Sequence, residues 1–390
     1  MAEALPPFGP AHGFGVYIHW PYCTRICPYC DFNVYAAKTR DTVDLSSAIL
    51  RDLSAHAGML SGHPALTSIF LGGGTPSLMT ANQMEDLITA CEAAFGLAND
   101  CEITLEANPN NVTAIAAKDW KSAGINRLSI GVQSLDDEAL SFLGRDHSSR
   151  DARKAAQIAQ SLFDTFSLDM IYARPGQSLK DWERELGDIL LLGAPHLSLY
   201  ELTIAPGTAF HRAAERGTLT PLPNDLQAEM YELTDTLTEA AGLSAYEVSN
   251  YARTASDRSR HNMIYWRSGD WVGIGPGAHG RLSIDGARIE TEAACKPEAY
   301  INAANRLDTC RQKRQGLSQQ DIAHELVSMG LRPTTGIALA RVEAVLGHPI
   351  SPSKLQHLRS GGWLAPTPDR LALTPAGRLL ADRVALELLS

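Results

Sequence analysis

Three cysteines near the start of the chain stand close enough in the sequence to act together as metal ligands. Cys23, Cys27 and Cys30 form a C-x3-C-x2-C pattern, and the next cysteine along the chain is Cys91. Metal sites built from thiolates usually supply four ligands. Three thiolates therefore predict a centre with one open coordination position, where a further molecule can bind or react.

Two kinds of centre are compatible with this pattern. Zinc often uses a C-x2-C pair as half of its site. It would then need His19 or a distant cysteine as a fourth ligand, and the sequence contains no second C-x2-C pair. An iron–sulfur cluster uses thiolates as its standard ligands, and three of them leave one iron of a four-iron cluster open. The residues alone leave both centres as hypotheses.

The cysteine pattern follows a β-type run, and further runs of this type alternate with amphipathic helical stretches up to about residue 245. The predicted strands cover residues 14–19, 67–71, 102–107, 127–132, 166–173 and 196–202. Such alternation predicts a parallel sheet with right-handed helical crossovers. We therefore expect an α/β fold, a partial (β/α)6 barrel of the TIM type.

Each predicted strand ends in a polar or glycine-rich cluster. Besides the cysteine loop, the clusters are GGGTPS, EANP, GVQS, DMIYARPG and YELTIAPGT. In barrels the carboxyl ends of the strands meet at one rim, and this rim carries the site. The sequence therefore predicts a single site to which every strand contributes.

Several residues of this rim could hold a ligand. Consecutive glycines at Gly72–Gly74 would let the backbone approach a bound molecule, although a tight turn would need them too. Glu106, Gln133 and Asp169 offer carboxylate and amide groups at strand ends, where a structural hydrogen bond is the alternative role. Arg145 could pair with a ligand carboxylate, or only with a neighbouring acid. A dinucleotide-binding fingerprint is excluded, because a third glycine is missing from the pattern.

From about residue 290 the pattern changes to short helices and a proline-rich hairpin. We expect an N-terminal tail at 1–13, the barrel with an extension at 14–285, and a smaller winged-helix-like α+β module at 286–390. Winged helices often bind DNA, but residues 317–390 contain seven Lys or Arg against six Asp or Glu, and the whole chain has a net charge of -10. Proteins that bind nucleic acid normally present an excess of cations. We therefore expect no nucleic acid partner, and a packing or lid role for the module.

The cysteine content and the start of the chain bear on the compartment. The first residues lack the basic and apolar regions of a signal peptide, and no apolar run approaches the length of a membrane span. The seven cysteines are odd in number and form no spaced disulfide framework. We expect a cytoplasmic protein in a reducing environment, without stable membrane insertion.

The C-x3-C-x2-C loop after the first strand and the GGGTP segment after the second resemble the signature of the radical S-adenosylmethionine (SAM) superfamily. This resemblance implies a [4Fe-4S] cluster held by Cys23, Cys27 and Cys30. It implies that the amino and carboxylate groups of SAM complete the coordination of the open iron. Reductive cleavage of SAM to a deoxyadenosyl radical is the chemistry of that superfamily.

A longer series of segments resembles one family within the superfamily. In chain order they are YIHWPYCTRICPYCDF, LGGGTPS, NRLSIGVQS, LGRDHS, DMIYARPGQ, YELTIAPGT, YEVSNYA, HNMIYW and GIGPGAHG. Together they are similar to the oxygen-independent coproporphyrinogen III oxidases and their relatives, the HemW-type heme chaperones. The resemblance implies a SAM-binding role for Tyr17, Tyr29, Gly73, Gly74, Thr75, Glu106, Gln133, Arg145 and Asp169.

Two features separate the dehydrogenases of this family from the chaperones. The dehydrogenases carry one more cysteine two residues after the third, where this chain has Phe32. The segment His261–Trp266, HNMIYW, resembles the HNxxYW motif of the chaperones, which the dehydrogenases lack. A neutral imidazole can ligate heme iron, and the two aromatic residues offer flat faces to a porphyrin. A packed turn around a structural histidine is the alternative.

The resemblance therefore favours a chaperone that binds the [4Fe-4S] cluster, SAM and heme, with His261 as the expected heme ligand and His279 as a second candidate. The implied partners are an unidentified heme-accepting protein, an electron donor if SAM is cleaved, and a second copy of the chain in a homodimer. Three alternatives stay open: a coproporphyrinogen III dehydrogenase, another radical SAM enzyme acting on a tetrapyrrole, and a structural zinc protein.

Overall fold

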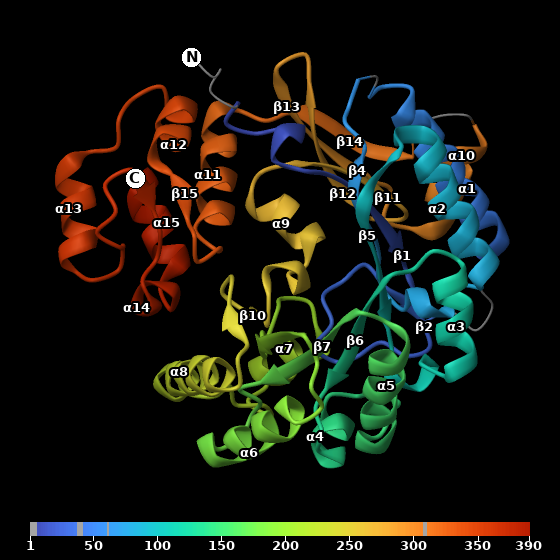
Figure 1. The fold of residues 1–390 in the computed structure, drawn as a ribbon, viewed down its shortest axis with the longest axis horizontal. Helices are drawn as coiled ribbons and strands as arrows, with labels where there is room; N and C mark the ends of the chain where they lie inside the picture. Colours follow the sequence, from blue (N-terminus) through green and yellow to red (C-terminus); the bar gives the residue numbers. More distant parts are fainter. Residues whose placement is uncertain (1–5, 37–41, 61, 307–309) are drawn as a thin grey trace.

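A computed structural model describes residues 6–36, 42–60, 62–306 and 310–390. A large curved sheet with helices along its outer side forms most of the molecule, and a smaller helical module from the C-terminal part of the chain lies beside it (Figure 1).

All six predicted strands are present in the large sheet. They are β1 (Phe14–Trp20), β4 (Leu66–Gly73), β5 (Leu97–Ala107), β6 (Arg127–Gln133), β7 (Thr165–Tyr172) and β8 (His196–Glu201). Each pairs in parallel with the next one along the chain. Their carboxyl ends therefore lie along one edge, as the predicted α/β barrel-type fold requires.

Helices connect these strands and cover the outer face of the sheet. They are α1 (Thr42–Ala57), α2 (Ala81–Phe95), α3 (Ala114–Ser122), α4 (Asp137–Phe142), α5 (Ser149–Leu162) and α6 (Leu179–Leu190). Capping boxes begin α2, α5 and α6, where Thr80, Ser148 and Ser178 accept backbone N–H groups of the first turn. These bonds satisfy donors that have no partner within the helix, so the sequence fixes where each of these helices begins.

Further elements extend the sheet at both edges. After β8 come α7 (Ala209–Glu215), α8 (Asn224–Ala240), β9 (Ser244–Ala245), β10 (Asn250–Ala252) and α9 (Arg260–Trp266). The chain then adds β11 (Asp270–Ile274), β12 (His279–Ile284), β13 (Ala287–Ala293), α10 (Pro297–Asn305) and β14 (Arg311–Gly316). Within the described ranges the sheet has twelve strands in the order β14-β13-β12-β11-β1-β4-β5-β6-β7-β8-β10-β9. Strand β11 is parallel to β1, whereas β12 to β14 and β9 to β10 are antiparallel additions.

The C-terminal module has a hydrophobic core of its own. Its elements are α11 (Gln319–Gly330), β15 (Ile337–Ala338), α12 (Leu339–Leu346), α13 (Pro352–Ser360), β16 (Arg370–Leu371), α14 (Pro375–Arg378) and α15 (Ala381–Leu389). Strands β15 and β16 form a small antiparallel sheet beside these helices, and the second core begins at Ala323. Because β13 and β14 still belong to the large sheet, we propose that the module begins near Leu317 rather than at 286.

Ion pairs fasten this module to the rest of the chain. Arg332 pairs with Glu247 at 2.9 Å, Arg281 pairs with Glu325 at 2.6 Å, and a third pair joins α14 to α8. The guanidinium of Arg332 also lies 4.4 Å from the ring centre of Trp266, the last residue of α9. The module is therefore held directly against the HNMIYW helix. Among the described helices, none has the length and apolar character of a membrane span.

Candidate functional site

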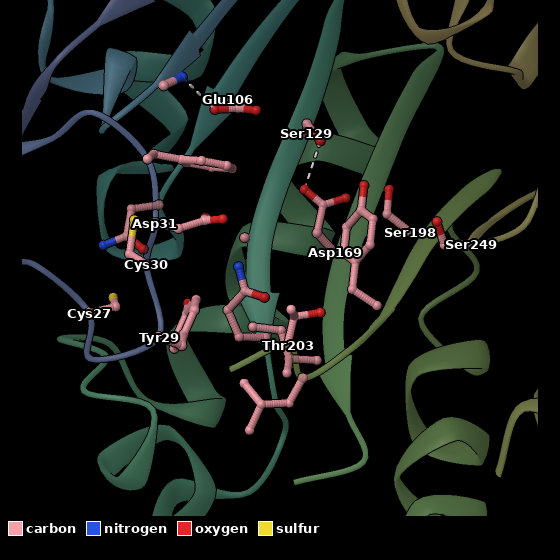
Figure 2. A pocket seen from close by; sticks show the side chains of 18 of the residues that line it. Cys27, Tyr29, Cys30, Asp31, Glu106, Ser129, Asp169, Ser198, Thr203 and Ser249 are labelled. Atoms are coloured by element: carbon pink, nitrogen blue, oxygen red, sulfur yellow. Dashed lines mark hydrogen bonds between the residues drawn. The ribbon is translucent and has the colours of Figure 1, made fainter. Parts of the chain in front are cut away.

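A cavity of about 750 Å³ lies at the carboxyl ends of the parallel strands. It reaches from the cysteine loop at one end to Ser259 and Asn262, at the start of α9, at the other. Figure 2 shows side chains from the cysteine loop and from strands β5 to β8 directed toward this space. Its volume falls in the range of cofactor and substrate sites, about 300–1,000 Å³.

The cysteine loop is closed at its base by two short strands. Strand β2 (Tyr22–Cys23) pairs in parallel with β3 (Tyr35–Ala36), and the Cys30 N–H donates to the Cys27 carbonyl at 3.1 Å. All three predicted cysteines line the cavity. In the described part of the chain, no three His, Cys, Asp or Glu side chains converge as the ligands of one metal ion would. Thiolates of a four-iron cluster bind different irons, so they need not converge on one point.

The charges on this loop suit an iron–sulfur cluster. The pKa of the Cys30 thiol is raised to about 11, mainly by burial and in smaller part by the nearby Cys27 and Cys23, because their thiolates would repel another negative charge. Three adjacent thiolates are stable only when positive charge is close to them. Metal ions supply that charge and are bound as the thiols lose their protons.

Arg145 supplies a cation beside the loop. Its Nη1 lies 3.5 Å from the Cys27 sulfur and 3.5 Å from the Tyr29 hydroxyl, and its Nη2 donates to the side-chain oxygen of Asn108. The neighbouring Asp146 instead accepts from Thr24 at 2.9 Å and from Asn108 at 2.6 Å. Arg145 therefore does not pair with Asp146, which was the structural alternative. It faces the cavity with a charge that suits a thiolate or a ligand carboxylate.

The glycine turn after β4 packs against the backbone that leads into the cysteine loop. The N–H groups of Gly74 and Thr75 donate to the carbonyls of Trp20 and Tyr22, at 2.7 and 2.9 Å. A Cβ atom on Gly74 would lie 2.8 Å from the Tyr22 oxygen, and one on Gly73, where φ is +109°, would lie 2.6 Å from the His19 ring. Both glycines are therefore needed for packing, and they also line the cavity together with Thr75.

Glu106 lies at the end of β5 and faces the same cavity. Its Oε2 accepts the N–H of Gly73 at 3.0 Å. The pKa of this carboxyl is raised to about 8, mainly by removal from water and in smaller part by the charge of Asp169, against the lowering effect of the Gly73 hydrogen bond. The group is therefore largely neutral at pH 7 until a cationic or amino group of a ligand faces it.

Gln133 and Asp169 complete the predicted set on β6 and β7, and both line the cavity. Asp169 accepts from the hydroxyls of Ser129 and Ser167, at 2.7 and 2.8 Å, and burial raises the pKa of its carboxyl. Gln133 has a left-handed backbone with φ of 64°, and its side-chain oxygen is buried without a partner within the described structure. A buried acceptor of this kind indicates a bound donor.

The two tyrosines of the predicted set lie in different places. Tyr29 lines the cavity beside Arg145. Tyr17 is absent from the described lining of this cavity, and its hydroxyl is hydrogen-bonded to His19 Nδ1 at 3.0 Å. The Tyr17 ring lies 6.2 Å from the rings of Phe70 and His261, so it packs behind the cavity wall.

His261 also lies behind the wall, in a packed polar contact. Its Nδ1 is hydrogen-bonded to the Ser68 hydroxyl at 2.9 Å and its Nε2 to the Tyr265 hydroxyl at 2.6 Å, while its ring stacks on Phe70. Burial lowers the pKa of this imidazole to about 3, so it is neutral. Both ring nitrogens are engaged, and ligation of iron would require one of these hydrogen bonds to break. The second candidate, His279, is exposed and lies outside the described lining of the cavity.

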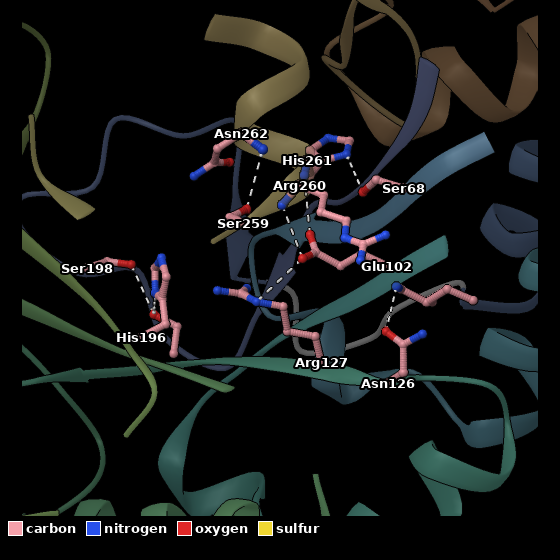
Figure 3. A network of polar contacts seen from close by, with 12 residues as sticks. Ser68, Glu102, Asn126, Arg127, His196, Ser198, Ser259, Arg260, His261 and Asn262 are labelled. Atoms are coloured by element: carbon pink, nitrogen blue, oxygen red, sulfur yellow. Dashed lines mark hydrogen bonds and ion pairs between the residues drawn. The ribbon is translucent and has the colours of Figure 1, made fainter. Parts of the chain in front are cut away.

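The structure adds cavity residues that the sequence analysis did not single out. Arg127, His196, Ser198, Ser259 and Asn262 line the end of the cavity away from the cysteines, which we call the inner end (Figure 3). Arg127 stands in the NRLSIGVQS segment as a charged residue at the start of a buried strand. That combination could have drawn attention to it, since a buried charge requires a partner.

Comparisons with known proteins agree with this geometry. Residues 17–189 match the family model of the radical SAM superfamily, and residues 317–380 match the HemN C-terminal domain. The heme chaperone HemW of Bacillus subtilis is 34% identical, with 94% of this chain and 97% of that protein covered. HemW of Escherichia coli is 40% identical over 76% of each chain. The chain belongs to the HemW-like family of radical SAM proteins.

Relatives in the family include mitochondrial proteins. Radical S-adenosyl methionine domain-containing protein 1 of Bos taurus, a protein named as mitochondrial, is 38% identical over 85% of this chain and 76% of its own length. Among solved structures, coproporphyrinogen III oxidase (HemN) from Escherichia coli shares the fold with a TM-score of 0.81, at 19% identity over 97% of this chain and 90% of that one. The match to the radical SAM superfamily supports a [4Fe-4S] cluster and SAM as cofactors.

Proposed function

We propose that the protein is a heme chaperone, which binds a [4Fe-4S] cluster, SAM and heme and passes heme to an acceptor protein. The observation that carries this proposal is the extent of the cavity. It connects the three cysteines with Asn262 of the HNMIYW helix, so that cofactor and cargo could occupy one continuous space. Several relatives with most of their length matched are named heme chaperones.

In this proposal Cys23, Cys27 and Cys30 hold the cluster. When bound and reduced, the cluster would supply the electron for cleavage of SAM. The protein's own part is to orient SAM, for which the cavity offers the Gly73 and Gly74 backbone, Thr75, Glu106, Gln133, Arg145, Asp169 and Tyr29. Tyr17 would act from behind this wall, by packing against Phe70.

Heme ligation by His261 stays a proposal with a structural condition attached. The imidazole would have to exchange its hydrogen bond to Ser68 or Tyr265 for the iron. Because the C-terminal module contacts Trp266 through Arg332, a movement of the module could accompany that exchange. Heme binding would then depend on the module, in keeping with the expected packing or lid role.

A coproporphyrinogen III dehydrogenase is the main alternative. The fold is shared with such an enzyme, and this cavity could also take a porphyrinogen. Phe32 weighs against this alternative. The residue lines the cavity and is 61% exposed, and it stands at the position where the dehydrogenases of this family carry a further cysteine.

The partners follow from the proposed function. A heme carrier needs a heme-accepting protein, an electron donor would be required if SAM is cleaved, and a homodimer is implied by the family resemblance. A reducing compartment such as the cytoplasm suits free cysteines that line a cavity, and some relatives are named as mitochondrial.

One preparation tests the function. Anaerobically purified protein with its cluster should give a saturable Soret band when titrated with heme. The same protein, reduced and supplied with SAM and coproporphyrinogen III, should form no protoporphyrinogen. Turnover of coproporphyrinogen without heme binding would replace the proposal by the dehydrogenase. In His261→Ala, loss of the band would support ligation by His261, whereas an unchanged band would assign the ligand to another residue.

A further inference from the structure

Arg127 is a buried cation whose hydrogen-bonding capacity is largely unused. It begins β6, its side chain is only 2% exposed, and it lines the inner end of the cavity. Its Nε and Nη2 atoms are buried and have no hydrogen-bond partner within the described structure. Unsatisfied buried donors are rare in folded proteins and require an explanation, such as a bound ligand.

Glu102 does not satisfy this guanidinium. Its Oε2 lies 3.7 Å from Arg127 Nε, which is close enough for an ion pair and too far for a hydrogen bond. The two carboxylate oxygens already accept the backbone N–H groups of Arg260 and His261, at 3.1 and 3.2 Å. Glu102 therefore balances the charge of Arg127 and caps the start of α9, but it leaves the N–H groups of the guanidinium available.

The guanidinium points into the cavity. Figure 3 shows its Nε on the side of Glu102 and its terminal nitrogens on the side of His196, which lines the same cavity as Ser198, Ser259 and Asn262. Both ring nitrogens of His196 are engaged, by Ser167 at 2.8 Å and by Tyr246 at 2.9 Å. That histidine is therefore held as a neutral wall and offers no competing charge.

We infer that the inner end of the cavity is a carboxylate subsite, in which Arg127 binds a propionate group of the heme and Asn262 of the HNMIYW helix lies beside it. An arginine fork can donate two parallel hydrogen bonds to a carboxylate, and such bonds are strong where water is excluded. This inference rests on the proposed function, since it assumes that heme is the cargo. It gives the HNMIYW helix a second contact with the ligand, through Asn262 on its cavity side, while His261 lies on its packed side.

The test compares heme with heme dimethyl ester, in which both propionates are esterified. Anaerobically purified protein with its cluster is titrated with each compound, and the Soret band is followed. We expect heme to bind roughly tenfold to a hundredfold more tightly than the ester, as for a hydrogen bond to a charged group. The double variant Arg127→Gln/Glu102→Gln removes the charges of both members of this ion pair, and it should bind the two compounds equally.

Two further variants make the comparison specific. Arg127→Lys keeps the charge without the fork and should retain an intermediate preference for heme. Arg153→Gln removes a surface arginine, which pairs with Asp188 at 2.9 Å, and should keep the full preference.

Each outcome decides the inference. Equal binding of heme and ester by the unchanged protein would overturn it, while heme binding itself would still support the proposed function. A preference that survives in the double variant would also overturn it, by moving the carboxylate contact away from Arg127. If the unchanged protein binds neither compound, the proposed function fails and the inference falls with it.

Discussion

Gln133 carries two energetically costly features at the rim of the cavity. Its backbone adopts the left-handed conformation that non-glycine residues rarely use, and its side-chain oxygen is buried without a donor among the described residues. Strained and unsatisfied groups of this kind collect at ligand sites, where the ligand supplies the missing contact. We therefore assign Gln133 to the binding of SAM rather than to the stability of the strand end.

Replacing Gln133 by glycine should separate these roles. In Gln133→Gly, relief of the left-handed strain offsets the flexibility of glycine, so the free energy of unfolding should stay unchanged or rise by up to about 1 kcal/mol. The affinity for SAM should fall roughly tenfold with the loss of a hydrogen bond to the ligand. Urea unfolding and equilibrium dialysis of SAM measure the two effects.

Asp285→Gly is the matched control for this variant. Asp285 also has a positive φ, of 51°, and it lies in the turn between β12 and β13, outside the described lining of the cavity. Its replacement should have a similar effect on stability and none on SAM binding. Full SAM affinity in Gln133→Gly would contradict the assignment.

His261 makes the folded state sensitive to acid. Its pKa falls from 6.5 to about 3 on burial, so the folded protein holds it neutral while the unfolded chain protonates it below pH 6.5. Stability is therefore lost as the pH falls from 6.5 toward 3. Between pH 7.5 and 5.5 the unchanged protein should lose roughly 1.4 kcal/mol more than His261→Gln, as urea unfolding at both pH values can measure. An equal loss in both proteins would mean that His261 is accessible to protons in the folded state.

At the scale of single elements, the turn after β4 must fit against the cysteine loop. A Cβ at residue 74 would meet the backbone at Trp20, Pro21 and Tyr22, at distances below 3.0 Å. Gly74→Ala should therefore displace the cysteine loop and reduce the iron and sulfide bound per chain by more than half, as iron and sulfide analysis can measure. The control is Gly187→Ala in the interior of α6, where the added Cβ would have no neighbouring atom within 4 Å. This variant should keep the cluster, and its free energy of unfolding should rise by roughly 0.5–1 kcal/mol. A full content of iron and sulfide in Gly74→Ala would contradict this prediction, because the backbone around residue 74 would then accommodate the methyl group.

The contact between α9 and the C-terminal module depends on Arg332. This residue is 31% exposed and pairs with Glu247, which is fully buried. Arg332→Met should lower the free energy of unfolding by about 1–3 kcal/mol, because it leaves the buried carboxylate without its cation. The loss should be smaller than for a fully buried pair, because Arg332 is partly exposed to water. Arg184→Met, which breaks a surface pair with Asp181, should cost less than about 1 kcal/mol. Equal losses by urea unfolding would contradict a special role for the Arg332 contact.

For the molecule as a whole, the sequence predicted the strands and their shared rim because buried parallel strands leave a clear apolar pattern. Each of the six predicted runs overlaps a strand of the large sheet. The same pattern brought the cysteines, Glu106, Gln133 and Asp169 to one cavity, since polar groups at the ends of parallel strands meet at one edge.

Other features depend on contacts between distant segments, which the sequence pattern does not encode. The orientation of α9 is one such feature. The spacing of residues in HNMIYW does not predict that His261 contacts Ser68 on β4 while Asn262 lines the cavity. The unused donors of Arg127 are another, because they follow from the way that the start of α9 occupies both oxygens of Glu102. The continuation of the sheet through β13 and β14 was likewise missed, since those strands are rich in polar and charged residues.

Under the proposed function, the molecule carries heme without altering it. The most direct test is to load the cluster-containing protein with heme, add SAM and a reductant under anaerobic conditions, and determine the mass and amount of heme after incubation. We expect one heme per chain, unchanged in mass. Consumption or modification of the heme, in step with cleavage of SAM, would contradict a carrier and identify an enzyme that acts on the tetrapyrrole.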